Sequence, residues 1–135
     1  MLMAWLVPEA GPARDHLAAT IDRLAAEHGA PRFEPHVTMA GRFHSGQEAA
    51  VRTLTSLAEG AGPFEVRFAA AGHEQAYFRA LYLRAEPSSQ LTALHEAARA
   101  AWALEPRPYM PHLSLLYADI AEEQKRAILG ALGIQ

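Results

Sequence analysis

The chain has 135 residues, half of them hydrophobic, and it carries a formal net charge of −3 at neutral pH. This length and apolar content fit a single domain over residues 1–135 with a sizeable core, and they exclude an intrinsically disordered chain. The acidic balance argues against a non-specific grip on long nucleic acid, because such a grip needs a basic field.

The first half of the chain alternates short apolar runs with segments of helical periodicity. Proline at position 12 is tolerated in the first turn of a helix, and Gly29 fits the position just after a helix end. Ser45 and Glu48 have the spacing of a capping box. The elements expected here are a strand over residues 2–7, a helix from 11–12 to 29, a strand over 36–43 and a helix from 45 to 60–63.

The second half shows the same alternation after an additional pair of strands. Residues 64–68 alternate apolar with charged side chains, which is typical of a half-buried strand. Asp119 and Glu122 have the spacing that caps a helix. The elements expected here are a strand over 64–68, a turn at 72–75, a strand over 76–84, a helix from 87–89 to 102, a strand from 112 and a helix after 119.

The order of these elements predicts an α+β fold built from two similar halves. Each half contains a helix, a proline-bearing loop, a strand that starts with Pro-His, and another helix. This pattern indicates two pseudo-symmetric lobes, in which antiparallel sheets form a central cleft and helices pack outside.

The two Pro-His strands share one pattern: proline, histidine, an apolar residue, a hydroxyl residue and an apolar residue. They cover residues 35–39 (PHVTM) and 111–115 (PHLSL). Successive side chains of a strand point to opposite faces, so each histidine shares a face with the hydroxyl two positions later. If the fold brings the strands side by side, two imidazoles and two hydroxyls face one pocket.

Paired His-x-(Ser/Thr) motifs of this kind resemble those of the 2H phosphoesterase superfamily. That superfamily includes bacterial RNA 2′,3′-cyclic phosphodiesterase/2′-5′ ligase proteins and the plant and fungal cyclic phosphodiesterases. The chain looks most like the cyclic phosphodiesterase branch, to which residues 5–8, 77–79 and 109–117 are also similar. The resemblance implies hydrolysis of a small cyclic phosphodiester, either a nucleoside 2′,3′-cyclic phosphate or ADP-ribose 1″,2″-cyclic phosphate, with no cofactor.

The candidate site residues fall into two groups. The residues expected to carry the reaction are His36, Thr38, His112 and Ser114. The residues that the resemblance implies around the base or ribose are Trp5, Tyr77 and Tyr117. Because Tyr117 lies three positions after Ser114, it can reach the pocket only if the strand ends or bulges near Leu116.

The two motifs suit the opening of a cyclic phosphodiester by water. One imidazole takes a proton from water, and the other protonates the departing ribose oxygen, since both protonation states of histidine are accessible near neutrality. The hydroxyls can donate hydrogen bonds to the phosphate oxygens. The scheme requires no metal. By resemblance, His112 activates the water and His36 protonates the leaving oxygen.

The remaining histidines and Arg79 have ordinary structural readings. Arg79 shares a predicted strand face with Tyr77, and we expect it to be a surface arginine. A zinc site built from histidines is not favoured, because no close-spaced ligand pattern exists. The histidines expected to be solvated or at helix ends are His16, His28 and His95, and those expected to flank loops are His44 and His73.

Two other functions remain open from the sequence. One is action on RNA 3′ ends, as a 2′,3′-cyclic phosphodiesterase or 2′-5′ ligase, which a basic rim around the cleft would favour. The other is a module that binds a phosphorylated nucleotide without turnover.

The expected setting is the cytoplasm, with no membrane contact and a monomer as the default state. The apolar start stops at Pro8 without a basic lead, unlike a secretory signal, and no apolar run approaches the ~20 residues that span a bilayer. The chain has no cysteine, which removes disulfides and thiolate chemistry and fits a reducing compartment.

Overall fold

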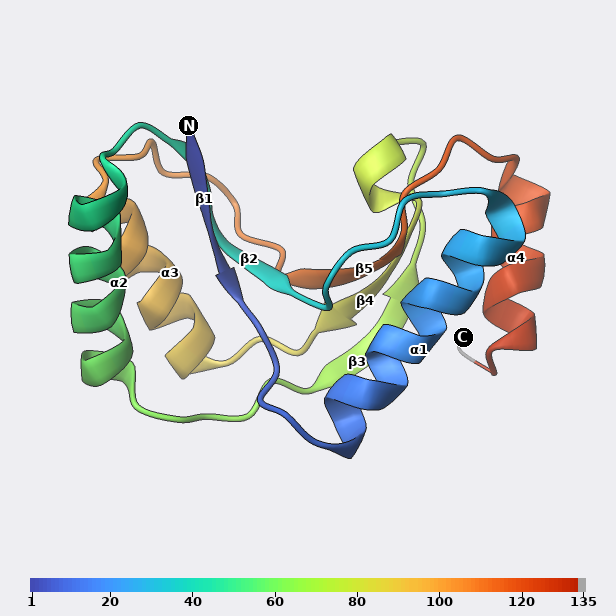
Figure 1. Cartoon of the computed structure of the whole chain (residues 1–135), viewed down its shortest axis with the longest axis horizontal. Helices are drawn as coiled ribbons and strands as arrows, with labels where there is room; N and C mark the ends of the chain where they lie inside the picture. Colours follow the sequence, from blue (N-terminus) through green and yellow to red (C-terminus); the bar gives the residue numbers. More distant parts are fainter. Residues whose placement is uncertain (134–135) are drawn as a thin grey trace.

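Strands and helices alternate along most of the chain in the computed structural model, which describes residues 1–133 (Figure 1). In chain order the elements are β1 (Leu2–Leu6), α1 (Pro12–His28), β2 (Val37–Phe43), α2 (Gln47–Ala61), β3 (Phe68–Gly72), the 3-10 turn η1 (Tyr77–Arg79), β4 (Leu81–Ala85), α3 (Ser89–Ala101), β5 (His112–Leu116) and α4 (Glu122–Ala131).

The five strands form one antiparallel sheet in the order β1-β2-β5-β4-β3. Its two central strands, β2 and β5, are joined by a single pair, Val37 with Leu113. The predicted α+β architecture is confirmed, and the antiparallel sheets of the two lobes are two parts of one sheet that meet at this junction. In Figure 1, α2 and α3 lie at one end of the sheet and α1 and α4 at the other.

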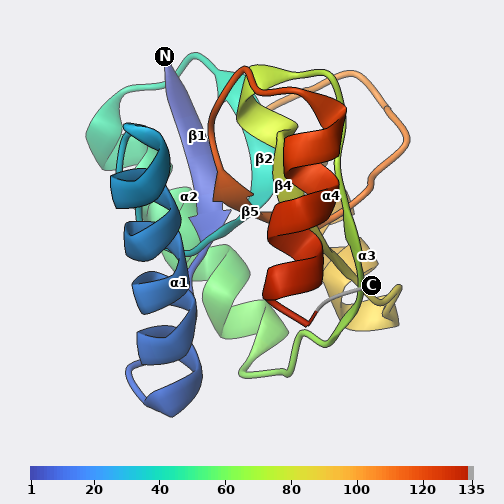
Figure 2. The same cartoon turned by 90° about the vertical axis from the view of Figure 1, so that its right-hand side faces the viewer.

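Each lobe takes one helix from each half of the sequence. α1 packs against β5 of the second half, while α3 packs against β2 of the first half. Viewed from the end of the molecule in Figure 2, α1 and α4 both lie in front of the sheet, with strands visible between them. This reciprocal exchange fits the predicted pseudo-twofold relation between the halves, and it ties the two lobes together through helix packing.

Two apolar clusters form the core, one for each lobe. The cluster under β5 and β4 contains the buried residues Ile21, Leu24, Val37, Leu81, Leu113, Leu115, Leu116 and Leu129. The cluster between β2, α2 and α3 contains Ala4, Met39, Ala40, Phe43, Ala50, Leu94 and Ala98. The apolar residues of both motifs therefore face the core, which confirms the predicted alternation of faces.

The strand predicted over residues 64–68 is wrong, because β3 begins only at Phe68. Phe64 packs against the cluster of α2 and α3, whereas Phe68 packs against the cluster of β4 and β5. The intervening residues cross from one lobe to the other, and only Arg67 joins the chain next to β4, where its carbonyl accepts from the Glu86 N–H. Residues 64–67 alternate apolar and charged side chains as a strand does, but they lack the ladder of backbone hydrogen bonds to a second strand that defines one.

The single strand predicted over residues 76–84 is also wrong. The chain first closes the turn η1, in which the Arg79 N–H donates to the Ala76 carbonyl and the Glu74 N–H donates to the Arg79 carbonyl. β4 begins after this turn, at Leu81. Tyr77 and Arg79 therefore lie on a turn beside the sheet rather than on one face of a strand.

The helices lie where the periodicity predicted them, but two of their caps differ. The residue before α2 is Gly46, and the Ser45 hydroxyl donates to the Gly46 carbonyl instead of capping the helix. α4 starts after Ala121 rather than Asp119, and the Gln124 side chain accepts a hydrogen bond from the Ala121 N–H at 3.2 Å. Among residues 1–133, the helices are all too short or too polar to cross a bilayer.

Candidate functional site

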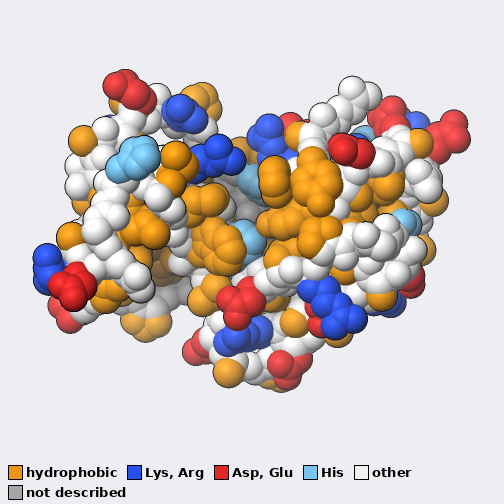
Figure 3. Space-filling view, turned by 45° about the horizontal axis from the view of Figure 1, so that its top comes forward, with side chains coloured by type: hydrophobic (Ala, Val, Ile, Leu, Met, Phe, Trp, Pro, Cys, Tyr) orange, Lys and Arg blue, Asp and Glu red, His pale blue; other side chains and the backbone are white. Residues whose placement is uncertain are grey.

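Strand pairing brings the four motif residues together on one face of the sheet. β2 and β5 run antiparallel through the Val37–Leu113 junction, so the histidine of each motif faces the hydroxyl residue of the other. The resulting cross-strand neighbours are His36 with Ser114 and Thr38 with His112. In the space-filling view, histidine side chains lie in a hollow between the lobes, bordered by hydrophobic side chains (Figure 3).

The outer strands extend these neighbours into two rows of side chains across the sheet. β1 adds an aromatic residue next to Thr38. β4 adds one residue next to His112 and one next to Ser114. The first row, read from β1 to β4, is Trp5, Thr38, His112 and Arg84. The second row, read from β2 to β3, is His36, Ser114, Tyr82 and Gly72.

Both imidazoles are anchored in the same way by the residue before the motif proline. The Nδ1 atom of His36 lies 2.7 Å from the Glu34 carbonyl oxygen, and Nδ1 of His112 lies 2.9 Å from the Met110 carbonyl oxygen. A carbonyl can only accept, so Nδ1 carries the proton and Nε2 is left for the cleft. The residue before a proline is extended, which gives the motif proline a role in aiming this carbonyl.

His36 is the more enclosed of the two imidazoles. Its ring stacks on the Trp5 indole, with 3.7 Å between centroids and 15° between planes, and the Phe33 ring meets it edge-on. Burial lowers the pKa of His36 below 6.5, and the nearby His112 lowers it further, while the hydrogen bond with the Glu34 carbonyl acts in the opposite sense. His36 is therefore biased toward the neutral form, which can accept a proton.

Thr38 is held through its backbone. The Tyr109 hydroxyl donates to the Thr38 carbonyl oxygen at 2.8 Å, and burial raises the pKa of Tyr109 to about 12, so this donor keeps its proton. The ring of Tyr109 stacks on His95, whose Nδ1 lies 2.7 Å from the Met39 carbonyl oxygen. Two side chains thus bind the carbonyls of β2 beyond its junction with β5. The prediction that His95 is solvated or at a helix end is wrong.

Ser114 is buried, and its hydroxyl already has a partner. It donates to the Phe78 carbonyl oxygen at 2.9 Å, which ties the turn η1 to β5. The oxygen retains lone pairs, but the hydroxyl has to rotate away from Phe78 before it can donate to a ligand.

The predicted aromatic residues are linked to His36 by ring contacts. β5 ends at Leu116, which releases Tyr117 from the strand alternation as the prediction required. The Tyr117 ring stacks on Phe33 with 3.9 Å between centroids, and the centroid of the Tyr77 ring lies 6.2 Å from that of Tyr117. Because the Phe33 ring also meets His36 edge-on, these rings form one cluster with the imidazole.

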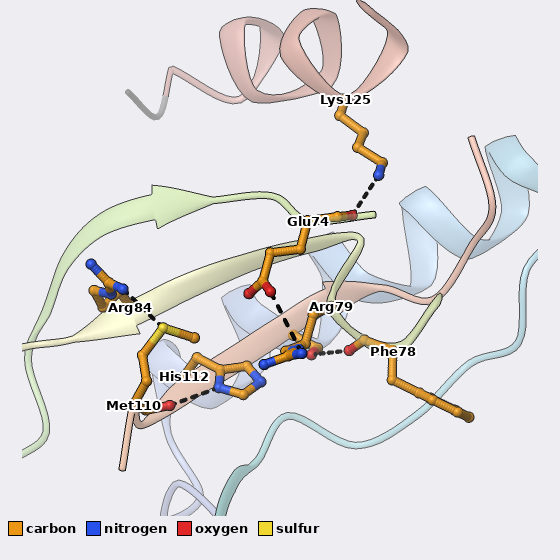
Figure 4. A network of polar contacts seen from close by, with 8 residues as sticks. Glu74, Phe78, Arg79, Arg84, Met110, His112 and Lys125 are labelled. Carbon is orange, nitrogen blue, oxygen red and sulfur yellow. Dashed lines mark hydrogen bonds and ion pairs between the residues drawn. The ribbon is translucent and has the colours of Figure 1, made fainter. Parts of the chain in front are cut away.

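Arg79 belongs to a polar network that holds the turn η1 (Figure 4). Its guanidinium lies 3.5 Å from the Glu74 carboxylate, and the Glu74 carbonyl accepts a hydrogen bond from the buried Lys125 at 2.6 Å. Burial raises the pKa of Tyr82, and the neighbouring Glu74 raises it further. The network fixes the backbone that accepts from Ser114 and supports the ring of Tyr82, which lies edge-on to His112 at 5.2 Å.

Several residues of the site were missed from the sequence. Tyr82 and Arg84 alternate with period two along β4, so the pairing of β4 with β5 would have identified them had the strand started at the right residue. Phe33 and Tyr109 lie in loops and gave no periodic signal. The missed residues that contact the site are Phe33, Phe78, Tyr82, Arg84 and Tyr109, and His95 lies behind them against Tyr109.

The other polar and hollow features of the chain lie apart from this face. Within residues 1–133, no three side chains of His, Asp or Glu converge into a group that could hold a metal ion. A cavity of about 700 Å³ lies on the opposite face of the sheet, where Val37 and Leu113 contribute to its lining. The sheet separates that cavity from both motif histidines.

The chain is similar to known proteins over most of its length. A family model described as the 2′-5′ RNA ligase superfamily matches residues 13–132. The chain is similar to a cyclic phosphodiesterase of Arabidopsis thaliana, with 26% identity over 123 residues, covering 90% of this chain and 67% of that protein. It is also similar to a 2′,3′-cyclic-nucleotide 3′-phosphodiesterase of Phaeosphaeria nodorum, with 34% identity over 133 residues, covering 85% of this chain and 67% of that protein. Both names fit the predicted class of enzyme, a phosphoric diester hydrolase.

Proposed function

Because this chain belongs to the 2′-5′ RNA ligase superfamily, we propose that it hydrolyses small cyclic phosphodiesters to phosphomonoesters, with His36 and His112 as the proton-transfer groups. The observation that carries the proposal is the matched anchoring of the two imidazoles, each fixed through Nδ1 with Nε2 free on the same face of the sheet. Binding alone needs cations or amides, whereas a matched acid and base serve turnover.

The proposed reaction is a displacement at phosphorus by water. The neutral imidazole takes a proton from water at Nε2 while the water oxygen forms a bond to phosphorus. The bond from phosphorus to one ribose oxygen breaks, and the protonated imidazole gives its Nε2 proton to that oxygen. Thr38 and Ser114 donate hydrogen bonds to the non-bridging oxygens, where negative charge grows in the transition state.

The environment of the histidines favours a definite assignment of roles. The lowered pKa of His36 supports a neutral His36 in the resting enzyme, which makes it the group that accepts the proton from water. His112 is then the group that protonates the leaving oxygen. This assignment reverses the one that the family resemblance implied, and the pH dependence treated in the Discussion tests it.

The proposed substrates are nucleoside 2′,3′-cyclic phosphates and ADP-ribose 1″,2″-cyclic phosphate. The names of the two relatives support a cyclic phosphate on a ribose. For nucleosides we propose a 2′-phosphate product, in line with the 3′-phosphodiesterase name of the fungal relative. The rings of Trp5, Tyr77 and Tyr117 are the proposed contacts of the base or ribose, since aromatic faces stack bases with little sequence preference.

A second candidate substrate is an RNA 3′ end that carries a cyclic phosphate. It is favoured by the cationic side chains that gather along one edge of the hollow in Figure 3. These are arginines, since the one lysine of the chain, Lys125, is buried, and cations near a site attract the phosphates of a nucleic acid strand.

The test is hydrolysis of adenosine 2′,3′-cyclic phosphate in excess chelator by wild type, His36→Ala and His112→Ala. We expect wild-type turnover and a loss of at least about a hundredfold in each variant, as is typical of a removed acid or base. His16→Ala, an exposed position on α1, is the matched control and keeps full activity. Survival of activity in both site variants, or its loss through chelation alone, contradicts the mechanism. Inactivity on the nucleotide but turnover of a cyclic-phosphate RNA end favours the second candidate.

A further inference from the structure

Arg84 occupies a defined place beside the catalytic face. It is paired directly with His112 across β4 and β5, so their side chains emerge on the same face of the sheet. It follows Trp5, Thr38 and His112 in the first row, and the next position, on β3, is the small residue Ala70. The row therefore has an aromatic ring on one side of the reacting groups and a guanidinium on the other side.

The guanidinium of Arg84 is exposed and has no ion-pair partner among residues 1–133. Its guanidinium contacts the Met110 sulfur at 2.9 Å (Figure 4), and a thioether is only a weak acceptor. The carboxylate of Glu74 pairs with Arg79 instead. An exposed guanidinium without a carboxylate presents its fork of donors to a ligand anion, and phosphate fits that fork in a bidentate manner.

The position of Arg84 indicates whether it can bind the reacting phosphate of a substrate or a second phosphate next to it. The two histidines and two hydroxyls already surround the place of the phosphate that is opened. Arg84 lies one strand farther out than His112, a step of about 4.8 Å, and its side chain runs toward Met110, away from Ser114. Its fork is thus placed for a group beside the reacting phosphate rather than for the reacting phosphate itself.

We propose that Arg84 is a specificity-determining residue that binds a second phosphate of the substrate, so that the enzyme prefers ribose cyclic phosphates that carry a further phosphate. This inference rests on the proposed function. It applies equally to a 5′-phosphate, to the diphosphate of ADP-ribose and to the preceding phosphodiester of an RNA end, which share the same anionic chemistry.

The preference can be measured through binding, independently of turnover. Calorimetry compares adenosine 2′-phosphate with adenosine 2′,5′-bisphosphate as ligands of wild type, Arg84→Gln and Arg84→Lys. We expect wild type to bind the bisphosphate about tenfold more tightly, as charge-assisted bidentate contacts allow. Arg84→Gln removes this preference, while Arg84→Lys keeps a part of it because the charge remains without the fork. Arg52→Gln, an exposed arginine on α2, is the matched control and keeps it.

Kinetics then separates this inference from the proposed function. The substrates are adenosine 2′,3′-cyclic phosphate and its 5′-phosphorylated form, and Arg84→Gln lowers kcat/KM for the second alone. Equal affinities in wild type, or a preference that survives in Arg84→Gln, overturn the role of Arg84. A preference in binding without hydrolysis of these two compounds, of ADP-ribose 1″,2″-cyclic phosphate or of a cyclic-phosphate RNA end supports the second-phosphate site and overturns the proposed function.

The source of the second phosphate is found with two further compounds. ADP-ribose 1″,2″-cyclic phosphate and a dinucleotide that ends in a cyclic phosphate are compared in wild type and Arg84→Gln. The compound whose kcat/KM falls most in the variant is the one whose additional phosphate Arg84 binds. A fall for neither compound, beside a fall for the 5′-phosphorylated nucleotide, identifies the 5′-phosphate as the group that Arg84 binds; a fall for none of the three overturns the proposal.

Discussion

The indole of Trp5 lies flat on the imidazole of His36, with ring centroids 3.7 Å apart and planes within 15° of each other. Trp5 is 44% exposed, and it belongs to neither of the two apolar core clusters. The stack closes one face of the imidazole, and the hydrogen bond to the Glu34 carbonyl fixes its edge. Together they leave His36 little freedom to turn.

We therefore predict that Trp5→Ala lowers kcat/KM for a cyclic phosphate about tenfold, whereas Trp5→Phe retains most of it. A stacked aromatic pair is worth about 1 kcal/mol beyond its buried area, and loss of orientation of a catalytic group adds to that effect. Steady-state kinetics of the two variants provides the measurement. Wild-type kinetics in Trp5→Ala would show that the stack positions neither His36 nor the substrate.

The pH dependence follows from the environment of His36. Burial lowers its pKa below 6.5, and the charge of His112 lowers it further. If neutral His36 accepts the proton from water, kcat/KM falls as the pH drops through this lowered pKa. The acid limb of the profile therefore lies below pH 6.5, and the protein stays active in mildly acidic buffer.

An NMR titration of the His36 ring tests the same point directly. We expect a midpoint below 6.5 in wild type and a higher midpoint in His112→Ala, because that variant removes a neighbouring positive charge. A midpoint at or above 6.5 in wild type would instead favour His36 as the acid and return the base role to His112.

The sequence predicted the centre of the site better than its surroundings. The spacing of two between histidine and hydroxyl determined which side chains share a face, and the structure places all four on one face of the sheet. The family match confirms the superfamily that these motifs indicated. The end of β5 at Leu116 allows Tyr117 to join the aromatic rings, as the prediction required.

The flanks of the site depend on strand pairing, which local patterns do not determine. Phe64 and Phe68 look like members of one strand, yet each packs on a different core cluster. Residues 77–79 look like strand residues, yet backbone hydrogen bonds close them into η1. Because β4 then starts later than predicted, the positions of Tyr82 and Arg84 opposite Ser114 and His112 could not be seen from the sequence.

Gly72 makes room for Tyr82 in the second row of the site. A Cβ atom at position 72 would lie 2.5 Å from Cζ of Tyr82, whose side chain is only 6% exposed and has little space to move. We predict that Gly72→Ala lowers the free energy of unfolding by about 1–3 kcal/mol, the usual cost of overpacking. Urea denaturation provides the measurement.

Tyr82→Ala provides the control for that clash. In the Gly72→Ala/Tyr82→Ala double variant the added methyl group meets no ring, so the loss should be smaller than the sum of the two single losses. Additive losses would mean that the glycine serves the backbone of β3 and not the ring beside His112.

Ser114 has two separable roles, a bond to the Phe78 carbonyl and a proposed bond to the substrate. Loss of the first alone costs about 1 kcal/mol of stability and loosens η1. Loss of the second removes a donor to the transition state, for which falls of about a hundredfold in kcat are typical.

We predict that Ser114→Ala shows both effects and that Ser114→Thr, which keeps a hydroxyl, restores most of kcat. Chemical denaturation and steady-state kinetics on the same two variants separate the roles. If Ser114→Ala loses stability but keeps its kcat, Ser114 only holds η1 in place through the Phe78 carbonyl. Thr38 would then be the motif hydroxyl that donates to the phosphate.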